Sequence, residues 1–169
     1  MRTRAAAIGS AVFFLLAPGV VAGVIPWWLT RWRVAAPLPA WPAVRVAGAA
    51  LILAGVLELV RAFARFVGEG RGTPAPVAPT ERLVVGGLYR YVRNPMYLAV
   101  AATIVGQALL LGRLGLLLYA ALFGVVVATF VKVHEEPALA RRFGADYEAY
   151  RRAVPRWWPR RRPWTGRGT

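Results

Sequence analysis

The chain has 169 residues, of which 58% are hydrophobic, and its formal net charge is +15 at pH 7. This composition is too apolar for an ordinary soluble domain and indicates one integral-membrane domain over residues 1–169. The chain has no cysteine and one histidine. Disulfides and thiolate ligands are therefore excluded, a zinc site is disfavoured, and we expect no bound metal.

The first apolar segment, residues 5–29, follows a basic start and is long enough to cross a bilayer. Two prolines inside it, Pro18 and Pro26, predict a kink or an end. A cleaved signal peptide is the competing interpretation, with Val20-Val21-Ala22 as the cleavage site. The apolar run continues beyond this site, which favours an uncleaved span.

The second predicted span covers residues 44–60 and has the minimal length for a crossing. Glu58 lies at its end, on the same helical face as Arg61. An acidic residue at that depth is a functional candidate, and an ion-paired helix end is the alternative. A Gly/Pro-rich linker follows over residues 68–80, for which we expect an extended conformation.

Arginine and tyrosine crowd the next stretch, residues 87–97, which reads G-L-Y-R-Y-V-R-N-P-M-Y. Asn94-Pro95 is a helix-start signal, because Asn can cap free N–H groups and Pro fits the first helical position. The N–H groups of that helix would suit an anion such as a carboxylate. An interfacial loop with anchoring tyrosines explains the same residues without a binding role.

Two further apolar runs, residues 96–111 and 114–131, are separated by a short turn and predict a helical hairpin. After Lys132 the chain becomes polar, and an amphipathic helical segment is expected, with a break at Gly144. The apolar positions of this segment recur at helical spacing: Leu139, Phe143, Tyr147, Tyr150 and Val154. The basic tail, residues 160–169, is expected to be disordered.

The distribution of charge predicts the topology. All lysines and arginines except Arg31, Arg33, Arg45 and Arg113 fall on the side of the two termini. The positive-inside rule places both termini in the cytoplasm of a bacterial-type inner or plasma membrane. The predicted fold class is an all-α integral membrane protein with about four transmembrane helices plus a C-terminal cytoplasmic amphipathic helical segment.

The hairpin returns the chain to the face that it left, so Arg93-Asn94 and Glu135-Glu136 can converge. Carboxylates, N–H donors and aromatic faces at one site suit a zwitterionic cofactor that carries a sulfonium group. In isolation, the acidic pair is explained as well by a helix end that offsets nearby arginines.

Two motifs resemble one known family: Y-R-Y-V-R-N-P-M-Y at residues 89–97, and E-E-P-A-L-A-R-R-F-G-A-D-Y-E-A-Y-R-R-A-V-P-R at residues 135–156. Together they are similar to the isoprenylcysteine carboxyl methyltransferases and their relatives, the phospholipid N-methyltransferases, over about residues 81–159. The resemblance implies a membrane methyltransferase that uses S-adenosyl-L-methionine. By position, it places the cofactor contacts at Glu81, Arg82, Leu83, Val84, Tyr89, Asn94, Pro95, Met96, Tyr97 and Glu135, with Glu136 beside the last.

The chain departs from this family at two positions. Asn94 stands where eukaryotic members have a histidine, and Val131 stands where they have an arginine near the substrate carboxylate. Arg93 could supply the missing cation, so we take Arg93 and Glu135 as the catalytic candidates. The acceptor is expected to be a lipophilic or lipidated carboxylate, amine or thiol that comes from the bilayer. For an amine or a hydroxyl, Glu135, Glu136 or His134 would be the base.

Two other functional classes stay open from the sequence. Membrane sterol reductases, which bind NADPH, have a similar C-terminal pattern but are longer. A non-catalytic protein that binds anionic membrane lipids through its basic tail would explain the charge. Nucleic acid is not an expected partner, because no recognition motif accompanies the arginines.

Overall fold

The computed structural model describes residue 12 and residues 16–68 and 82–166; their regular secondary structure is helical, with no strand among them. The predicted all-α class is therefore confirmed for this part of the chain. The chain divides into two compact units by its contacts. The apolar unit comprises Phe14–Val60 and Met96–Val127, and the polar unit comprises Met1–Phe13, Arg61–Pro95 and Ala128–Thr169.

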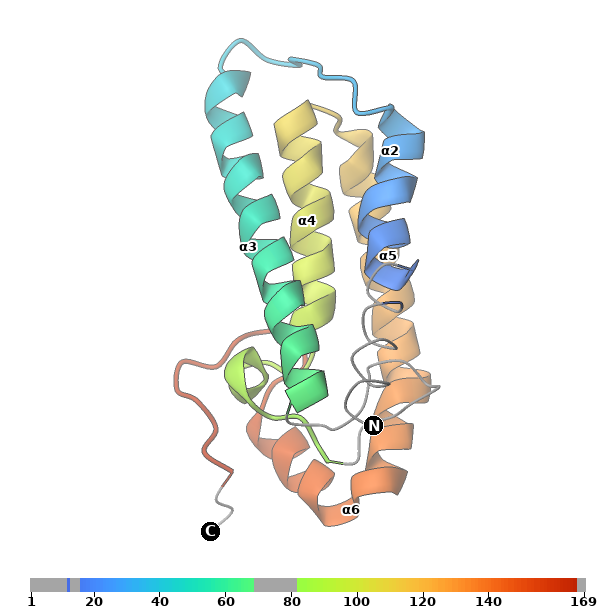
Figure 1. The fold of residues 1–169 in the computed structure, drawn as a ribbon, viewed down its shortest axis with the longest axis vertical. Helices are drawn as coiled ribbons and strands as arrows, with labels where there is room; N and C mark the ends of the chain where they lie inside the picture. Colours follow the sequence, from blue (N-terminus) through green and yellow to red (C-terminus); the bar gives the residue numbers. More distant parts are fainter. Residues whose placement is uncertain (1–11, 13–15, 69–81, 167–169) are drawn as a thin grey trace. The chain divides into compact units, whose positions relative to one another are not determined.

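Four apolar helical segments build the apolar unit (Figure 1). The π-helical segment η1 (Val20–Val24) continues into α2 (Ile25–Thr30), and α3 (Trp41–Gly68) follows. The last two are α4 (Pro95–Leu111) and α5 (Gly115–Phe130). The hairpin and the helix start at Pro95 are confirmed. The second span is longer than predicted at both ends.

Pro26 explains the π-helical turn in the first segment. Proline lacks an N–H group, and its ring clashes with the carbonyl four residues earlier, which here belongs to Ala22. A widened turn directly before proline relieves that clash. The Gln107 side chain then donates from Nε2 to the Ala22 carbonyl at 2.6 Å, so the buried acceptor stays satisfied. The kink predicted in this segment is confirmed.

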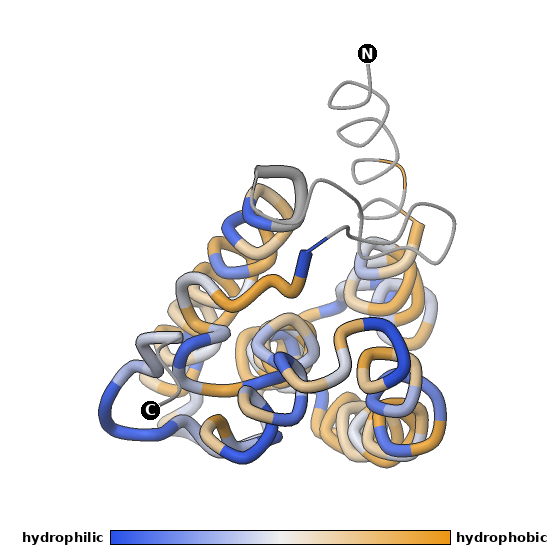
Figure 2. Tube along the Cα trace, turned by 90° about the horizontal axis from the view of Figure 1, so that it is seen from below, coloured by the Kyte–Doolittle hydropathy of each residue, from blue (hydrophilic) through white to orange (hydrophobic). Residues whose placement is uncertain are grey.

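Two helices of the described chain, Trp41–Arg65 and Gly115–Ala153, are long and apolar enough to cross a membrane. Leu16–Thr30 and Pro95–Leu111 are apolar but shorter. Large apolar side chains stay exposed on the two long helices, for example Leu53 at 71% on α3 and Leu118 at 77% on α5. The hydropathy-coloured trace shows the same apolar character along these helices (Figure 2). Lipid is the environment in which such surfaces are stable.

The polar unit is built around α6 (Glu136–Ala153), which continues from α5 through a second π-helical segment, η3 (Val131–Glu135). Pro137 stands just after this wide turn, as Pro26 does in α2. Gly144 interrupts α6 with φ 51° and ψ −123°, which confirms the predicted break. The apolar stripe of α6 packs under the chain around Leu83 and against Trp164.

The segment after α6, residues 154–166, is called the strap here because it runs along the loop that precedes α4. Backbone N–H groups of Arg160 and Trp164 donate to the carbonyls of Tyr91 and Arg90, each at 2.9 Å. The Arg93 N–H donates to the Pro155 carbonyl, also at 2.9 Å. The tail was expected to be disordered; up to Trp164 its backbone pairs with loop carbonyls in the structure.

Candidate functional site

The loop before α4 presents the first half of the site. It turns at Gly87, which has φ +56°, passes through the short 3-10 helix η2 (Gly87–Arg90), and reaches α4 at Asn94-Pro95. A residue with a side chain at Gly87 would be strained, and its Cβ would meet the Arg65 guanidinium. Asn94 is buried, and its Nδ2 donates to the Arg156 carbonyl at 3.1 Å. The loop and the strap thus hold each other in place.

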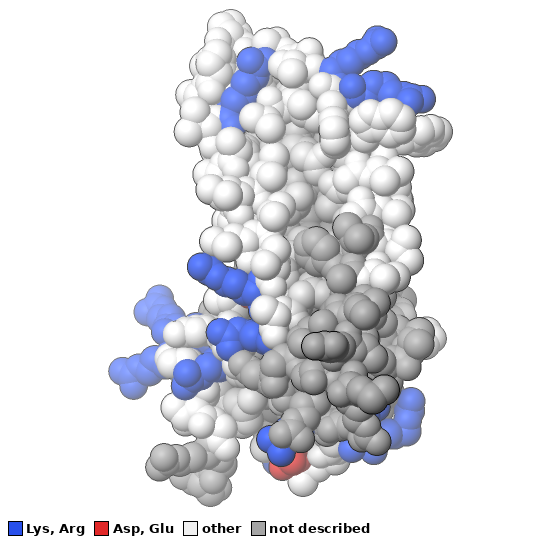
Figure 3. All heavy atoms as spheres, viewed as in Figure 1, with Lys and Arg blue, Asp and Glu red and all other residues white. Residues whose placement is uncertain are grey.

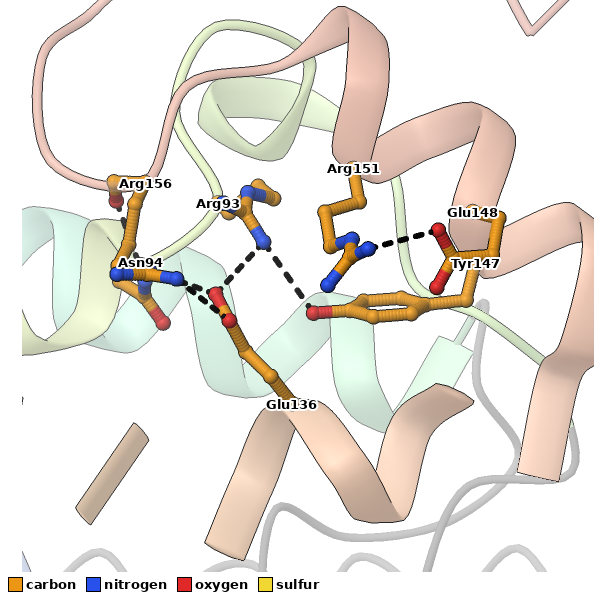
Figure 4. Close-up of polar contacts among 7 residues, drawn as sticks. All are labelled: Arg93, Asn94, Glu136, Tyr147, Glu148, Arg151 and Arg156. Atoms are coloured by element: carbon orange, nitrogen blue, oxygen red, sulfur yellow. Dashed lines mark hydrogen bonds and ion pairs between the residues drawn. The ribbon is translucent and has the colours of Figure 1, made fainter. Parts of the chain in front are cut away.

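Glu136 is the centre of the site, in the first turn of α6 (Figure 4). Its side chain is 8% exposed and accepts three hydrogen bonds from arginines. Arg93 donates from Nη1 at 2.7 Å, and Arg156 donates from Nε and Nη2 at 2.7 and 2.6 Å. The two hydrogen bonds from Arg156 to Glu136 form the bidentate pairing that guanidinium and carboxylate groups favour. These hydrogen bonds raise the pKa of Arg156.

Two tyrosines of α6 close the site beside this network. Arg93 Nη1 also donates to the Tyr147 hydroxyl at 3.3 Å, and the Tyr150 hydroxyl donates to the Tyr89 carbonyl at 2.7 Å. Burial raises the pKa of both tyrosines, and the Glu136 charge raises that of Tyr147 further. Both hydroxyls are therefore protonated at neutral pH. Tyr147 accepts from Arg93 and keeps an O–H to donate.

A pocket of about 240 Å³, counted with its opening to solvent, lies among these groups. Its enclosed part has only about 20 Å³, far below the roughly 300–1,000 Å³ of common ligand sites, so the structure shows where polar groups converge and not a cavity of ligand size. The expectation that the loop and the acidic pair come together is confirmed, since Arg93, Asn94, Glu135 and Glu136 all line it. The remaining lining residues are Val131, Leu139, Tyr147 and Tyr150.

The other residues predicted from the sequence lie elsewhere. Glu81 is outside the described residues, and Arg82 is exposed. Leu83 packs on the α6 core, whereas Val84, Tyr89 and Pro95 are buried. Met96 and Tyr97 belong to the apolar unit, as does Glu58. The structure therefore gathers four of the predicted residues at the pocket.

The residues predicted from the sequence to form the site did not include Arg156, Tyr147 and Tyr150. The two tyrosines were part of the predicted apolar stripe, and three-residue spacing places them on one helical face. The sequence did not indicate that the two tyrosines lie at the pocket beside Glu136. Arg156 follows the helix after Pro155, and nothing local indicates that it folds back onto Glu136.

Val131 and His134 are the other two positions that the sequence analysis connected with the acceptor, as the place of a cation and as a candidate base. Val131 is 1% exposed and lines the pocket, so no cation stands at that position. His134 is exposed and stacks on Phe130, with 5.5 Å between ring centroids, and it is not a lining residue. His134 therefore lies outside the lining of the pocket. Arg93 remains the buried cation of the pocket, and its Nε has no hydrogen-bond partner.

A family model of phospholipid methyltransferases matches residues 43–146, which is more than half of the chain. The chain belongs to the phospholipid methyltransferase family. The match includes Arg93, Asn94, Glu135 and Glu136, and it ends just before Tyr147. No curated protein and no solved structure matches the chain significantly. Phospholipid methyltransferase membership identifies a methyltransferase, and the apolar helices agree with a membrane protein of this family.

The described residues contain no group of three histidine, cysteine, aspartate or glutamate side chains that could hold a metal ion. The site itself offers two carboxylates, two arginines, an amide and two tyrosines. These groups bind charged and polar ligands by hydrogen bonds.

Proposed function

We propose that the chain is an S-adenosyl-L-methionine-dependent methyltransferase that methylates a lipophilic acceptor at the cytoplasmic face of the membrane. The observation that carries the proposal is the single pocket lined by Arg93, Asn94, Glu135 and Glu136, residues from two segments about 40 positions apart. Its location within the range matched by the phospholipid methyltransferases supports the same chemistry.

The chemistry of the residues that line the pocket supports binding of the amino-acid end of this cofactor. Asn94 lines it at the start of α4, where helix N–H groups suit a carboxylate. Glu135 lines the same pocket and suits an ammonium group. The two tyrosines offer rings to a sulfonium cation. When bound, S-adenosyl-L-methionine supplies a methyl group that is activated by its positively charged sulfur.

The protein groups would act mainly by positioning and by keeping water out. Glu136 fixes the Arg93 guanidinium at 2.7 Å and so orients it toward the pocket. Tyr147 keeps its proton and can donate to an anionic group beside Arg93. Glu135 is the candidate base for an amine or hydroxyl acceptor, and a carboxylate acceptor needs no base. We expect the lipophilic tail of the acceptor to approach from the bilayer.

Cofactor binding to the purified protein in detergent tests the proposal. We expect saturable binding of S-adenosyl-L-methionine with a dissociation constant of about 1 µM to 1 mM, and no comparable binding of NADPH. Glu135→Gln should weaken it by about tenfold or more, because a charge-assisted hydrogen bond is lost. Glu148→Gln, an exposed change on α6, is the matched control and should bind like the wild type. Binding of NADPH alone would contradict the proposal.

The role of Arg93 is tested separately from cofactor binding. If Arg93 orients the acceptor in place of the arginine that Val131 replaces, Arg93→Ala should lose methyl transfer while cofactor binding persists. Arg93→Lys, which preserves the charge beside Glu136, guards against a folding defect and should keep part of the activity. Turnover should be measured with lipophilic carboxylates, amines and thiols. Unchanged turnover of Arg93→Ala would exclude the role.

A further inference from the structure

A second cationic site lies in the apolar unit, at the end that carries the loop between α2 and α3. This Arg/Trp end is defined by Trp27, Trp28, Arg31, Trp32, Arg33, Arg45 and Arg113. Arginine side chains lie there in two groups on the face drawn in Figure 3, with no acidic side chain among them. It shares no residue with the pocket described above.

The loop is held by the turn between α4 and α5. The Ala35 N–H donates to the Leu111 carbonyl at 2.7 Å, and the Ala35 carbonyl lies against Gly112. Gly112 has φ +65°, and a Cβ there would overlap that carbonyl. This close approach requires glycine. The loop is therefore a fixed platform for the arginines around it.

Two guanidinium groups are anchored on this platform. Arg113 donates from Nε to the Arg33 carbonyl at 2.8 Å, and Arg45 donates from Nη2 to the Ala35 carbonyl at 3.1 Å. The two acceptor carbonyls belong to Arg33 and Ala35, which are two positions apart and therefore separated by at most about 7 Å along the chain. The anchors therefore bring both guanidinium groups close to one stretch of backbone, with most of their N–H donors still available.

Within the described residues of the apolar unit, the acidic side chain is Glu58. It lies 13 positions after Arg45 on α3, a distance of about 20 Å along a helix. This separation is about twice the distance over which charges interact at physiological salt. Arg45 Nε is also buried without a hydrogen-bond partner. Within the described apolar unit, the arginines at this end therefore have no acidic side chain near them, and one of their donors has no hydrogen-bond partner.

The tryptophans indicate where the counter-charge comes from. Trp28 is 64% exposed and Trp32 is 56% exposed, which is unusual for such large apolar rings. Trp41 is buried and donates from Nε1 to the Leu109 carbonyl at 2.9 Å. Tryptophans concentrate at the headgroup level of membranes. A phosphate in the same layer offers anionic oxygens to the guanidinium forks.

We propose that the Arg/Trp end binds the phosphate of an anionic phospholipid in the adjacent leaflet. Arg45 and Arg113 hold the phosphate oxygens, Arg33 adds attraction, and the exposed tryptophans lie among the acyl chains and glycerol groups. The site makes this end of the protein selective for anionic lipids over zwitterionic ones, because no acidic side chain in the described apolar unit lies near the positive charge.

The test compares lipids that remain bound to the full-length protein, using native mass spectrometry after exchange into micelles containing phosphatidylglycerol and phosphatidylcholine. The wild type should retain phosphatidylglycerol preferentially, and this preference should fall about thirtyfold in Arg45→Gln/Arg113→Gln. Arg33→Gln/Arg113→Gln, which leaves the partly buried Arg45 intact, should fall in the same direction and guards against a folding defect. Arg141→Gln/Arg142→Gln, on exposed positions of α6, is the control with equal charge loss and should retain the preference.

Thermal unfolding with added inorganic phosphate separates a lipid site from a site for any soluble anion. Phosphatidylglycerol should raise the unfolding temperature of the wild type, and inorganic phosphate at the same concentration should not. Equal retention of the two lipids, equal stabilisation by inorganic phosphate, or a lost preference in the α6 control would each overturn the proposal.

Discussion

Glu136→Gln is expected to lower the free energy of unfolding by about 3 kcal/mol, because the change leaves two arginines at the site without their counter-charge. The substitution keeps the volume of the side chain. Its amide would place an N–H₂ donor against Arg93 or Arg156, which approach the carboxylate at 2.7 Å or less. The expected loss lies at the lower end of the range for breaking a buried ion pair, because the Arg156 side chain is 34% exposed and water can partly replace the carboxylate.

The same change should reduce methyl transfer by about 10- to 100-fold, because an arginine misplaced by about 1 Å no longer positions a ligand. Glu148→Gln makes the identical chemical change on the same helix, at an exposed ion pair with Arg151. It should cost less than about 0.5 kcal/mol. Unfolding titrations in detergent and turnover assays of both variants check this. Equal stability of the two variants would show that the Glu136 network contributes little.

Short-range signals in the sequence were sufficient to predict where several helices begin or are distorted. Asn94-Pro95 starts α4, Pro26 distorts the first helix, and Gly144 breaks α6. Each depends on backbone chemistry within one or two turns, namely a missing N–H, a fixed φ or a left-handed conformation. Such features are readable from neighbouring residues alone.

The partners of Glu136 were not readable in the same way. Arg93 lies 43 residues before it and Arg156 lies 20 residues after it. The chain has 22 lysine and arginine residues, so charge alone does not select these two. The choice is made by the strap, whose backbone N–H groups pair with loop carbonyls. Such pairing leaves no pattern in the side chains, whereas the basic, terminal character of the tail favours disorder.

Gly48→Ala is expected to destabilise the apolar unit by about 1–3 kcal/mol, the cost of overpacking a close contact. Gly48 faces α4, where an added Cβ would lie 2.5 Å from the Leu110 nitrogen and 2.7 Å from the Gly106 carbonyl oxygen. Both are backbone atoms, so the clash can be relieved only by moving the helices apart. Ordinarily Gly→Ala within a helix is stabilising by about 1 kcal/mol, and the expected sign is therefore reversed.

Gly124→Ala is the matched control, because it is the same change inside α5 and its Cβ would meet nothing within 4 Å. It should be neutral or stabilising. Gly106→Ala brings a second Cβ into the same crossing, 2.8 Å from the Gly48 carbonyl oxygen. Once one alanine has separated α3 from α4, the second should cost less, so the double variant should be less destabilised than the sum of the two single changes. The free energy of unfolding should be measured for the three single variants and for the double variant. Additive losses would mean that the structure around the two glycines relaxes independently. A stable Gly48→Ala variant would mean that α3 and α4 do not pack this closely.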